Sequence, residues 1–405
     1  MSRANPVHRG SGVARILLVF VAVVSLGMPD GLLGVAWPSV RDAFSRPLDS
    51  LGALLLAFTA GYLTSSSLSG YAIARAGVAW LLAGSCALTG LSLIGYTLAP
   101  GWGTLVGLAV ATGLGAGAID GGINTYVASP YGERLMHWLH ASWGIGITLG
   151  PLVMTTGLER FHSWRWGYVV VGAAQIGLGA FFACTLPLWR DPPASHAADH
   201  EKPLIDFRTP LADTLRHPPV WGSVLLFFLF SGAEATAGMW TYTLLTESRG
   251  MAPKVAGILV GAYWASFTLG RIVAGLYAAR LGTPSVIRYN LAGAGVAAAL
   301  YAWNPSWFLG HAGLLLLGLF IAPIFPGLVS GTSERVGRRD AANTIGLQIG
   351  AAGLGAALIP GLAGTLARRS NLEIVPLYLV ALVAFLLALD LGLRRFCRAT
   401  HESEE

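Results

Sequence analysis

The chain consists mainly of long apolar stretches that follow one another with few charged residues inside them. A helix that crosses a bilayer needs about 20 mostly apolar residues. Only 11% of the 405 residues are charged, whereas soluble proteins average about 25%, and the mean hydropathy is +0.62. We therefore predict an all-α membrane protein with twelve transmembrane helices, at residues 14–38, 51–73, 78–98, 103–128, 138–158, 167–189, 219–245, 254–278, 284–303, 307–331, 343–366 and 373–393.

The polar, proline-containing segment 190–218 divides the predicted helices six and six. We expect two six-helix bundles, residues 1–189 and 219–405, joined by this segment as a linker, with a short tail after the last helix. The connections on one side of the predicted membrane carry about twice as many Lys and Arg residues as those on the other side. Membrane proteins carry this excess on the cytoplasmic side. The pattern predicts that both termini and the linker are cytoplasmic.

A short motif occurs once in each half. Residues 70–77 read GYAIARAG and residues 275–282 read GLYAARLG, so both follow G-x-x-x-A-R-x-G at the end of the second helix of a half. Agreement at the same topological position indicates a parallel duplication. We expect a tight turn between packed helices, in which glycine allows close approach and arginine faces the cytoplasm. Its residues are Gly70, Arg75, Gly77, Gly275, Arg280 and Gly282.

The six-plus-six division, the linker and the loop motif resemble the major facilitator superfamily. The loop pattern of that superfamily is G-x-x-x-D-[RK]-x-G-[RK]-[RK]. In this chain Ala74 and Ala279 replace the aspartate, and the trailing basic residues are missing. The resemblance implies a monomer with a central cleft lined by the first, fourth, seventh and tenth helices of the chain. The tenth helix contains PIFPG (323–327), which predicts a kink.

Residues 115–151 carry a closer resemblance. An acid in G-x-x-[DE]-x-x-x-N is followed by L-H-x-S-[FW]-G-x-G, which resembles the fucose:proton symporter family and its sodium-dependent glucose transporter-like branch. In that family, an acid on the first helix and one on the fourth serve proton coupling and sugar recognition. Asp30 and Asp120 occupy the matching positions. Ala141 stands where the fucose transporter has an asparagine.

The informative ionisable residues inside predicted helices, where a charge costs about 2.5–3.5 kcal/mol, are Asp30, Asp120, Glu234 and Arg271. Asp30, Asp120 and Glu234 fall on helices expected to line the cleft. Arg271 is expected to be structural, and the choice between transport and ion pairing stays open for Glu234. Asn124 follows Asp120 by four residues, so it shares a helix face with the carboxylate. Other candidate contacts of a sugar are Trp143, Trp240, Tyr263 and Gln348.

The sequence contains no nucleotide-binding motif and no cluster of catalytic or metal-binding residues, and its three cysteines are scattered. It therefore predicts a transporter and not an enzyme, with no cofactor and no nucleic-acid partner. We expect proton-coupled symport of a sugar or a similar small polar solute by alternating access in a bacterial cytoplasmic membrane, surrounded by lipid, with Na⁺ as the other possible coupling ion. The alternative is a drug or metabolite efflux antiporter. Gly146, Gly150 and Pro151 resemble part of the fifth-helix signature of drug:proton antiporters, but the G-G that follows in that signature is missing, so they keep this alternative open without favouring it.

Overall fold

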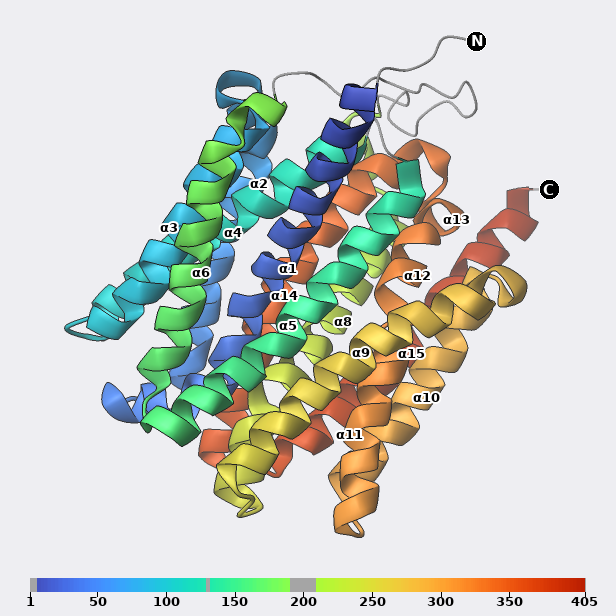
Figure 1. Cartoon of the computed structure of the whole chain (residues 1–405). Helices are drawn as coiled ribbons and strands as arrows, with labels where there is room; N and C mark the ends of the chain where they lie inside the picture. The colour runs from blue at the N-terminus through green and yellow to red at the C-terminus, as the bar shows by residue number, and fades with distance from the viewer. Residues whose placement is uncertain (1–5, 129–131, 190–208, 405) are drawn as a thin grey trace. The chain divides into compact units, whose positions relative to one another are not determined.

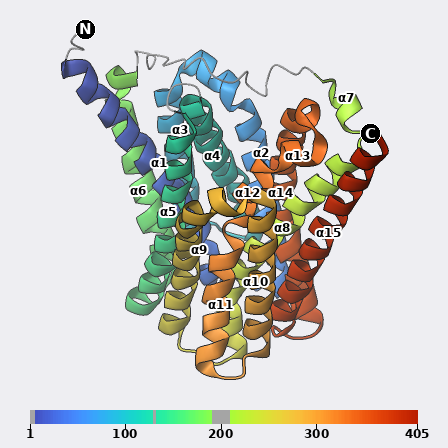
Figure 2. The ribbon, with the colours of Figure 1, turned by 90° about the vertical axis from the view of Figure 1, so that its right-hand side faces the viewer.

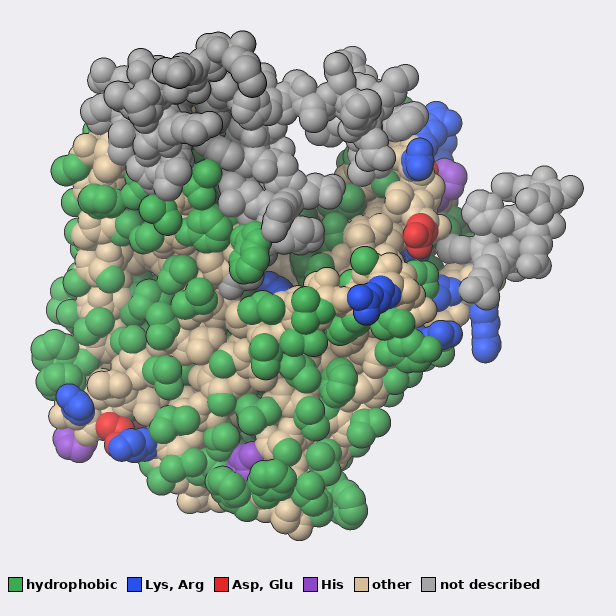
Figure 3. Space-filling view, turned by 45° about the vertical axis from the view of Figure 1, so that its right-hand side comes forward, with side chains coloured by type: hydrophobic (Ala, Val, Ile, Leu, Met, Phe, Trp, Pro, Cys, Tyr) green, Lys and Arg blue, Asp and Glu red, His purple; other side chains and the backbone are tan. Residues whose placement is uncertain are grey.

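The computed structural model describes residues 6–128, 132–189 and 209–404, and within these ranges the regular structure is entirely helical. Ten of the described helices are long and apolar enough to cross a membrane. Hydrophobic side chains cover most of the described surface in Figure 3, where charged side chains are sparse. The prediction of an all-α membrane protein is confirmed. Most of the predicted linker, 190–208, lies outside the described residues.

The helices divide into two compact units. The first comprises residues 1–46, 53–199 and 253–261, and the second comprises 47–52, 200–252 and 262–405. The boundary at 199/200 falls inside the predicted linker. Two short segments group with the other half of the sequence: 47–52, which holds the short helix Leu48–Ser50, and 253–261, the first residues of α9.

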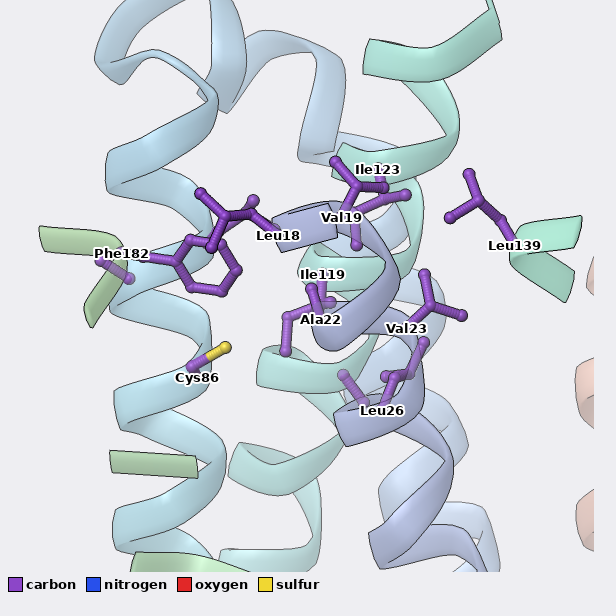
Figure 4. Packing of buried hydrophobic residues seen from close by; sticks show 13 residues of the cluster. Leu18, Val19, Ala22, Val23, Leu26, Cys86, Ile119, Ile123, Leu139 and Phe182 are labelled. Atoms are coloured by element: carbon purple, nitrogen blue, oxygen red, sulfur yellow. The ribbon is translucent and has the colours of Figure 1, made fainter. Parts of the chain in front are cut away.

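The first unit contains the six helices predicted for the N-terminal half (Figure 1). They are α1 (Pro6–Ala43), α2 (Leu51–Ala76), α3 (Val78–Leu98), α4 (Trp102–Ala128), α5 (Gly132–Phe161) and α6 (Trp164–Cys184). In Figure 4, Leu18, Ala22 and Leu26 of α1 lie in one cluster with Ile119 of α4 and Phe182 of α6. Burial of these apolar side chains fixes which faces of α1 and α4 point inward.

The second unit contains the remaining helices. They are α7 (Leu211–Thr214), α8 (Pro218–Thr243), α9 (Pro253–Leu281), α10 (Thr283–Trp303), α11 (Trp307–Ile321), α12 (Ile324–Ser330), α13 (Thr332–Val336), α14 (Arg338–Arg369) and α15 (Ile374–Glu404). A π-helical turn, Leu244–Ser248, extends α8. The predicted tenth helix is interrupted between α11 and α12 at Pro323, so the expected break is confirmed. Figure 2 shows α10 and α11 side by side.

Candidate functional site: an acid cluster in the first unit

α1 and α5 cross at a contact built from glycines. A Cβ atom on Gly27 would lie 2.3 Å from the backbone oxygen of Trp143, and Gly31 is similarly close to the backbone of α5. On the facing helix, Gly146 and Gly150 would bring a Cβ atom within 2.0 Å and 2.5 Å of backbone oxygens of α1. Small residues let membrane helices approach to backbone contact. The crossing therefore places the end of the L-H-x-S-W-G-x-G segment, Trp143 and Gly146, beside α1.

Asp30 receives its hydrogen bond at this crossing. The indole Nε1 of Trp143 donates to Asp30 Oδ2 over 3.2 Å, and both side chains are partly buried. Trp143 was expected to contact a sugar through its ring face. The structure adds a second role, because its N–H holds the carboxylate of α1.

A second glycine contact, between α2 and α4, positions Asp120. A Cβ atom on Gly117 would lie 2.2 Å from the backbone oxygen of Tyr62, and one on Gly61 would lie 2.1 Å from a backbone oxygen of α4. The Tyr62 hydroxyl donates to Asp120 Oδ2 over 2.5 Å. Asn124 Nδ2 donates to Oδ1 over 3.1 Å, so the hydrogen bond expected from the four-residue spacing is present. Both carboxylate oxygens of Asp120 therefore have a donor.

These five side chains form one group, which we call the acid cluster: Asp30, Tyr62, Asp120, Asn124 and Trp143. Asp30 and Asp120 interact electrostatically with each other, and Tyr62 interacts with both. Among the described residues, neither carboxylate belongs to an ion pair. Two carboxylates share a mostly apolar surrounding with only neutral donors. Binding or release of a proton therefore changes the net charge of the cluster.

Sequence reasoning missed Tyr62. A tyrosine in an apolar helix looks like any packing or interfacial aromatic residue, and the closer resemblance, at residues 115–151, did not include the second helix. The one available signal is Gly61 beside it, since a glycine inside a membrane helix often marks a close helix contact.

The second unit holds a charged pair of its own. Glu234 on α8 and Arg271 on α9 interact electrostatically. The Arg271 guanidinium also lies 4.5 Å from the centroid of the Phe267 ring, and the Tyr263 hydroxyl donates to the backbone oxygen of Glu234 over 3.4 Å. Glu234 therefore has an opposite charge nearby, unlike the acids of the first unit.

Three predicted contacts of the substrate are buried inside the second unit. Trp240 and Tyr263 have no exposed surface, and Trp240 Nε1 donates to the backbone oxygen of Pro360 over 2.9 Å. Gln348 is also fully buried and donates to Ser223 Oγ over 2.7 Å. Their polar atoms bind neighbouring helices, and none of the three has free surface for a solute in this structure.

The repeated loop motif forms the expected turns. Gly77 has a φ of +79° and Gly282 a φ of +74°, a region that favours glycine. A Cβ atom on Gly70 or Gly275 would meet nothing described within 4 Å, so the expected close approach is absent at these two positions. Arg75 and Arg280 are exposed, as expected of residues at a membrane boundary. The motif therefore serves as a helix-ending turn.

Another R-x-G sequence, at 335–337, was not singled out from the sequence. Gly337 has a φ of +81°, the same turn as in the repeated motif. Its arginine is buried, however: Arg335 Nε donates to Ser223 Oγ over 3.0 Å, and Thr332 Oγ1 donates to Gln348 Oε1 over 3.1 Å. These hydrogen bonds connect the N-terminal part of α8 with α13 and α14.

The model of the Major Facilitator Superfamily matches residues 19–303 and 241–404. The chain belongs to the major facilitator superfamily. Its relatives include the human sodium-dependent glucose transporter 1, 23% identical over 67% of this chain and 58% of the relative. The glucose/mannose transporter GlcP of Bacillus subtilis is 19% identical over 89% of this chain and 90% of the relative. The resemblance to transporters of the fucose and glucose type is confirmed.

Solved structures share the fold. A bacterial homologue of the human lysosomal transporter Spinster superposes with a TM-score of 0.76 over 98% of both chains, at 13% identity. The fucose:proton symporter FucP of E. coli superposes with a TM-score of 0.64 over 95% of this chain and 99% of FucP, at 14% identity. The chain is a membrane transporter, and its homologues are transporters and not enzymes.

Proposed function

We propose that the chain is a proton-coupled sugar symporter that works by alternating access. The observation that carries the proposal is the acid cluster, in which neutral donors hold two carboxylates on helices α1 and α4 of one bundle. The names of the relatives support the substrate class, since they include glucose and glucose/mannose transporters and a fucose:proton symporter shares the fold.

The cluster suits a site that alternates between two charge states. An ionised carboxylate accepts hydrogen bonds from Tyr62, Trp143, Asn124 or sugar hydroxyls, and a protonated carboxyl group can also donate one. An uncompensated charge in hydrocarbon costs about 2.5–3.5 kcal/mol. Protonation together with a neutral sugar removes that charge before the bundles reorient. We assign this role to Asp120 and Asp30, with the ring of Trp143 available to a sugar face.

Glu234 receives a different assignment. Arg271 interacts electrostatically with Glu234, so an ionised Glu234 has an opposite charge near it without binding a proton. We propose that Glu234 and Arg271 stabilise the second unit and that coupling belongs to the acid cluster. Both termini are proposed to be cytoplasmic, in a bacterial cytoplasmic membrane.

The test is uptake of radiolabelled D-glucose, D-mannose and L-fucose by purified protein in liposomes with an acid-outside pH gradient. We expect accumulation of at least one sugar, and a protonophore should abolish it. Asp120→Asn should lose accumulation but retain exchange of labelled for unlabelled sugar. The matched control is Asp213→Asn on α7, a solvent-accessible acid paired with Arg216, which should behave as wild type.

Three outcomes would contradict parts of the proposal. Accumulation by Asp120→Asn against a gradient would exclude proton coupling at that residue. Accumulation driven by a sodium gradient without a pH gradient would replace H⁺ by Na⁺. Failure of every sugar, combined with Asp120-dependent resistance of cells to toxic compounds, would favour the efflux antiporter.

A further inference from the structure

α1 has a backbone oxygen, that of Ser25, which lacks its usual donor within the helix. Pro29 lies inside this helix and has no backbone N–H. In a regular helix the N–H of residue 29 would donate to the backbone oxygen of Ser25, four residues earlier. That oxygen therefore loses its helical donor in the middle of a membrane span, where water is not available to replace it.

A side chain of α6 supplies the missing donor. Gln175 Nε2 donates to the backbone oxygen of Ser25 over 2.6 Å. Only the NH₂ end of an amide can donate to a carbonyl, which fixes the orientation of this side chain. Gln175 is 1% exposed, and its Oε1 atom has no hydrogen-bond partner in the described part of the chain. The bond to Ser25 is therefore the polar contact that accounts for a buried glutamine at this position.

We propose that Gln175 is a positioning residue of the acid cluster: it replaces the N–H that Pro29 lacks and so holds the turn of α1 at Pro29, which carries Asp30 to Trp143. α1 is fixed on one side by Gln175 of α6 and on the other by the contact of Gly27 with α5. Asp30 follows Pro29 directly and receives its bond from Trp143 of α5. The part of Gln175 in transport rests on the proposed function. Its replacement of the N–H that Pro29 lacks does not.

A double-mutant cycle tests whether the Gln175 amide replaces the backbone N–H that residue 29 lacks. Gln175→Leu leaves the Ser25 oxygen without a donor, so the midpoint of thermal unfolding in detergent should fall by a few degrees. In a Pro29→Ala background, residue 29 supplies its own N–H, and the same change should lower the midpoint much less. Such non-additivity is the signature of two groups that serve one partner. Equal losses in both backgrounds would overturn the proposal, whether or not the protein transports sugar.

Transport tests the positioning role. Sugar uptake by Gln175→Leu should have a maximal rate at least tenfold lower and a changed pH profile, because Asp30 is no longer held against Trp143. Asn290→Leu is the matched control: it removes another buried side-chain amide that donates to a backbone oxygen, in the second unit, and should lower stability without changing the pH profile of uptake. Pro29→Ala/Gln175→Leu should be stable but impaired. A wild-type pH profile in that variant would overturn the positioning role, and failure of wild-type uptake would instead contradict the proposed function.

Discussion

Tyr62 and Asn124 each donate to a different oxygen of Asp120, so the carboxylate has little freedom to rotate. The two donors are not equivalent. Asn124 lies on the same helix, four residues away, and keeps its place whatever α2 does. Tyr62 comes from α2 and ties that helix to the acid through a bond of 2.5 Å. The tyrosine is therefore the member of the cluster that links the state of Asp120 to the position of another helix.

Tyr62→Phe removes this bond and keeps the ring. A hydrogen bond to a charged group contributes about 1.5–3 kcal/mol, so we expect sugar accumulation to fall by about tenfold or more. Stability should change less, because the ring still packs on Phe58 with centroids 6.2 Å apart. Uptake assays and thermal unfolding of the same preparation check this. Wild-type accumulation by Tyr62→Phe would remove Tyr62 from the proposed mechanism.

Glu373, in the turn before α15, offers a pH test outside the membrane spans. Arg249 Nε and Nη2 donate to its two carboxylate oxygens over 3.0 Å and 2.8 Å, and these bonds hold the pKa of Glu373 below its ordinary value. A lowered pKa stabilises the folded protein above the unfolded value of about 4.3. This stabilisation is lost as the pH falls further, through the folded pKa.

We therefore expect the thermal midpoint to fall below about pH 5, by a small amount because the carboxylate is partly exposed. Glu373→Gln should lower the midpoint at pH 7 and weaken its dependence on pH in the acid range. Thermal unfolding between pH 4 and pH 7 measures both. An identical pH dependence in the two proteins would show that other acids are responsible.

At the scale of single residues, the sequence identified the charged residues of the site better than the residues that contact them. Asp30 and Asp120 could be predicted because an acid in an apolar helix is costly and therefore conspicuous. The i, i+4 spacing also predicted the bond from Asn124. Tyr62 and Gln175 could not be predicted, because their partners are 58 and 150 residues away in the sequence. Which aromatic rings are fully buried depends on the same tertiary contacts.

At the scale of helices, most predictions came from the length of the apolar stretches and from the positions of proline. Several helices extend beyond the predicted apolar ranges. The prediction used apolar length, whereas backbone hydrogen bonds can continue a helix into polar residues. The interruption at Pro323 followed from PIFPG. The glycine contacts between α1 and α5 did not follow, since the 53 glycines of the chain do not reveal which of them face a neighbouring helix.

The α1–α5 contact predicts a sharp difference between glycines. Gly27→Ala places a methyl group against the backbone oxygen of Trp143, so the helices must separate. Overpacking of this kind costs about 1–3 kcal/mol, and the bond between Trp143 and Asp30 should weaken with it. Gly84→Ala on the exposed side of α3 is the control, because its Cβ atom would meet nothing within 4 Å.

Thermal unfolding and sugar uptake should both decline in Gly27→Ala. Gly84→Ala should be neutral or stabilising by up to about 1 kcal/mol. Equal behaviour of the two variants would mean that α1 and α5 are not in backbone contact in the membrane.

At the scale of the whole molecule, the two halves share a glycine turn but differ in their buried charged residues. Both end their second helix with the same glycine turn, at Gly77 and Gly282. The first unit holds two acids with neutral donors, whereas the second pairs Glu234 with Arg271. In the proposed mechanism the first unit binds the proton, and Glu234 and Arg271 stabilise the second unit.

Orientation in the membrane is the last prediction, and it follows from the distribution of Lys and Arg over the whole chain. Both glycine turns should face the cytoplasm. In a background with the three native cysteines replaced, Ala76→Cys and Ala279→Cys, both at exposed positions next to the turns, should resist a membrane-impermeant maleimide added to intact cells. They should react once the membrane is opened. Ser45→Cys, in the connection after α1, should react in intact cells. The reverse pattern would invert the topology and, with it, the direction in which a proton gradient drives the sugar.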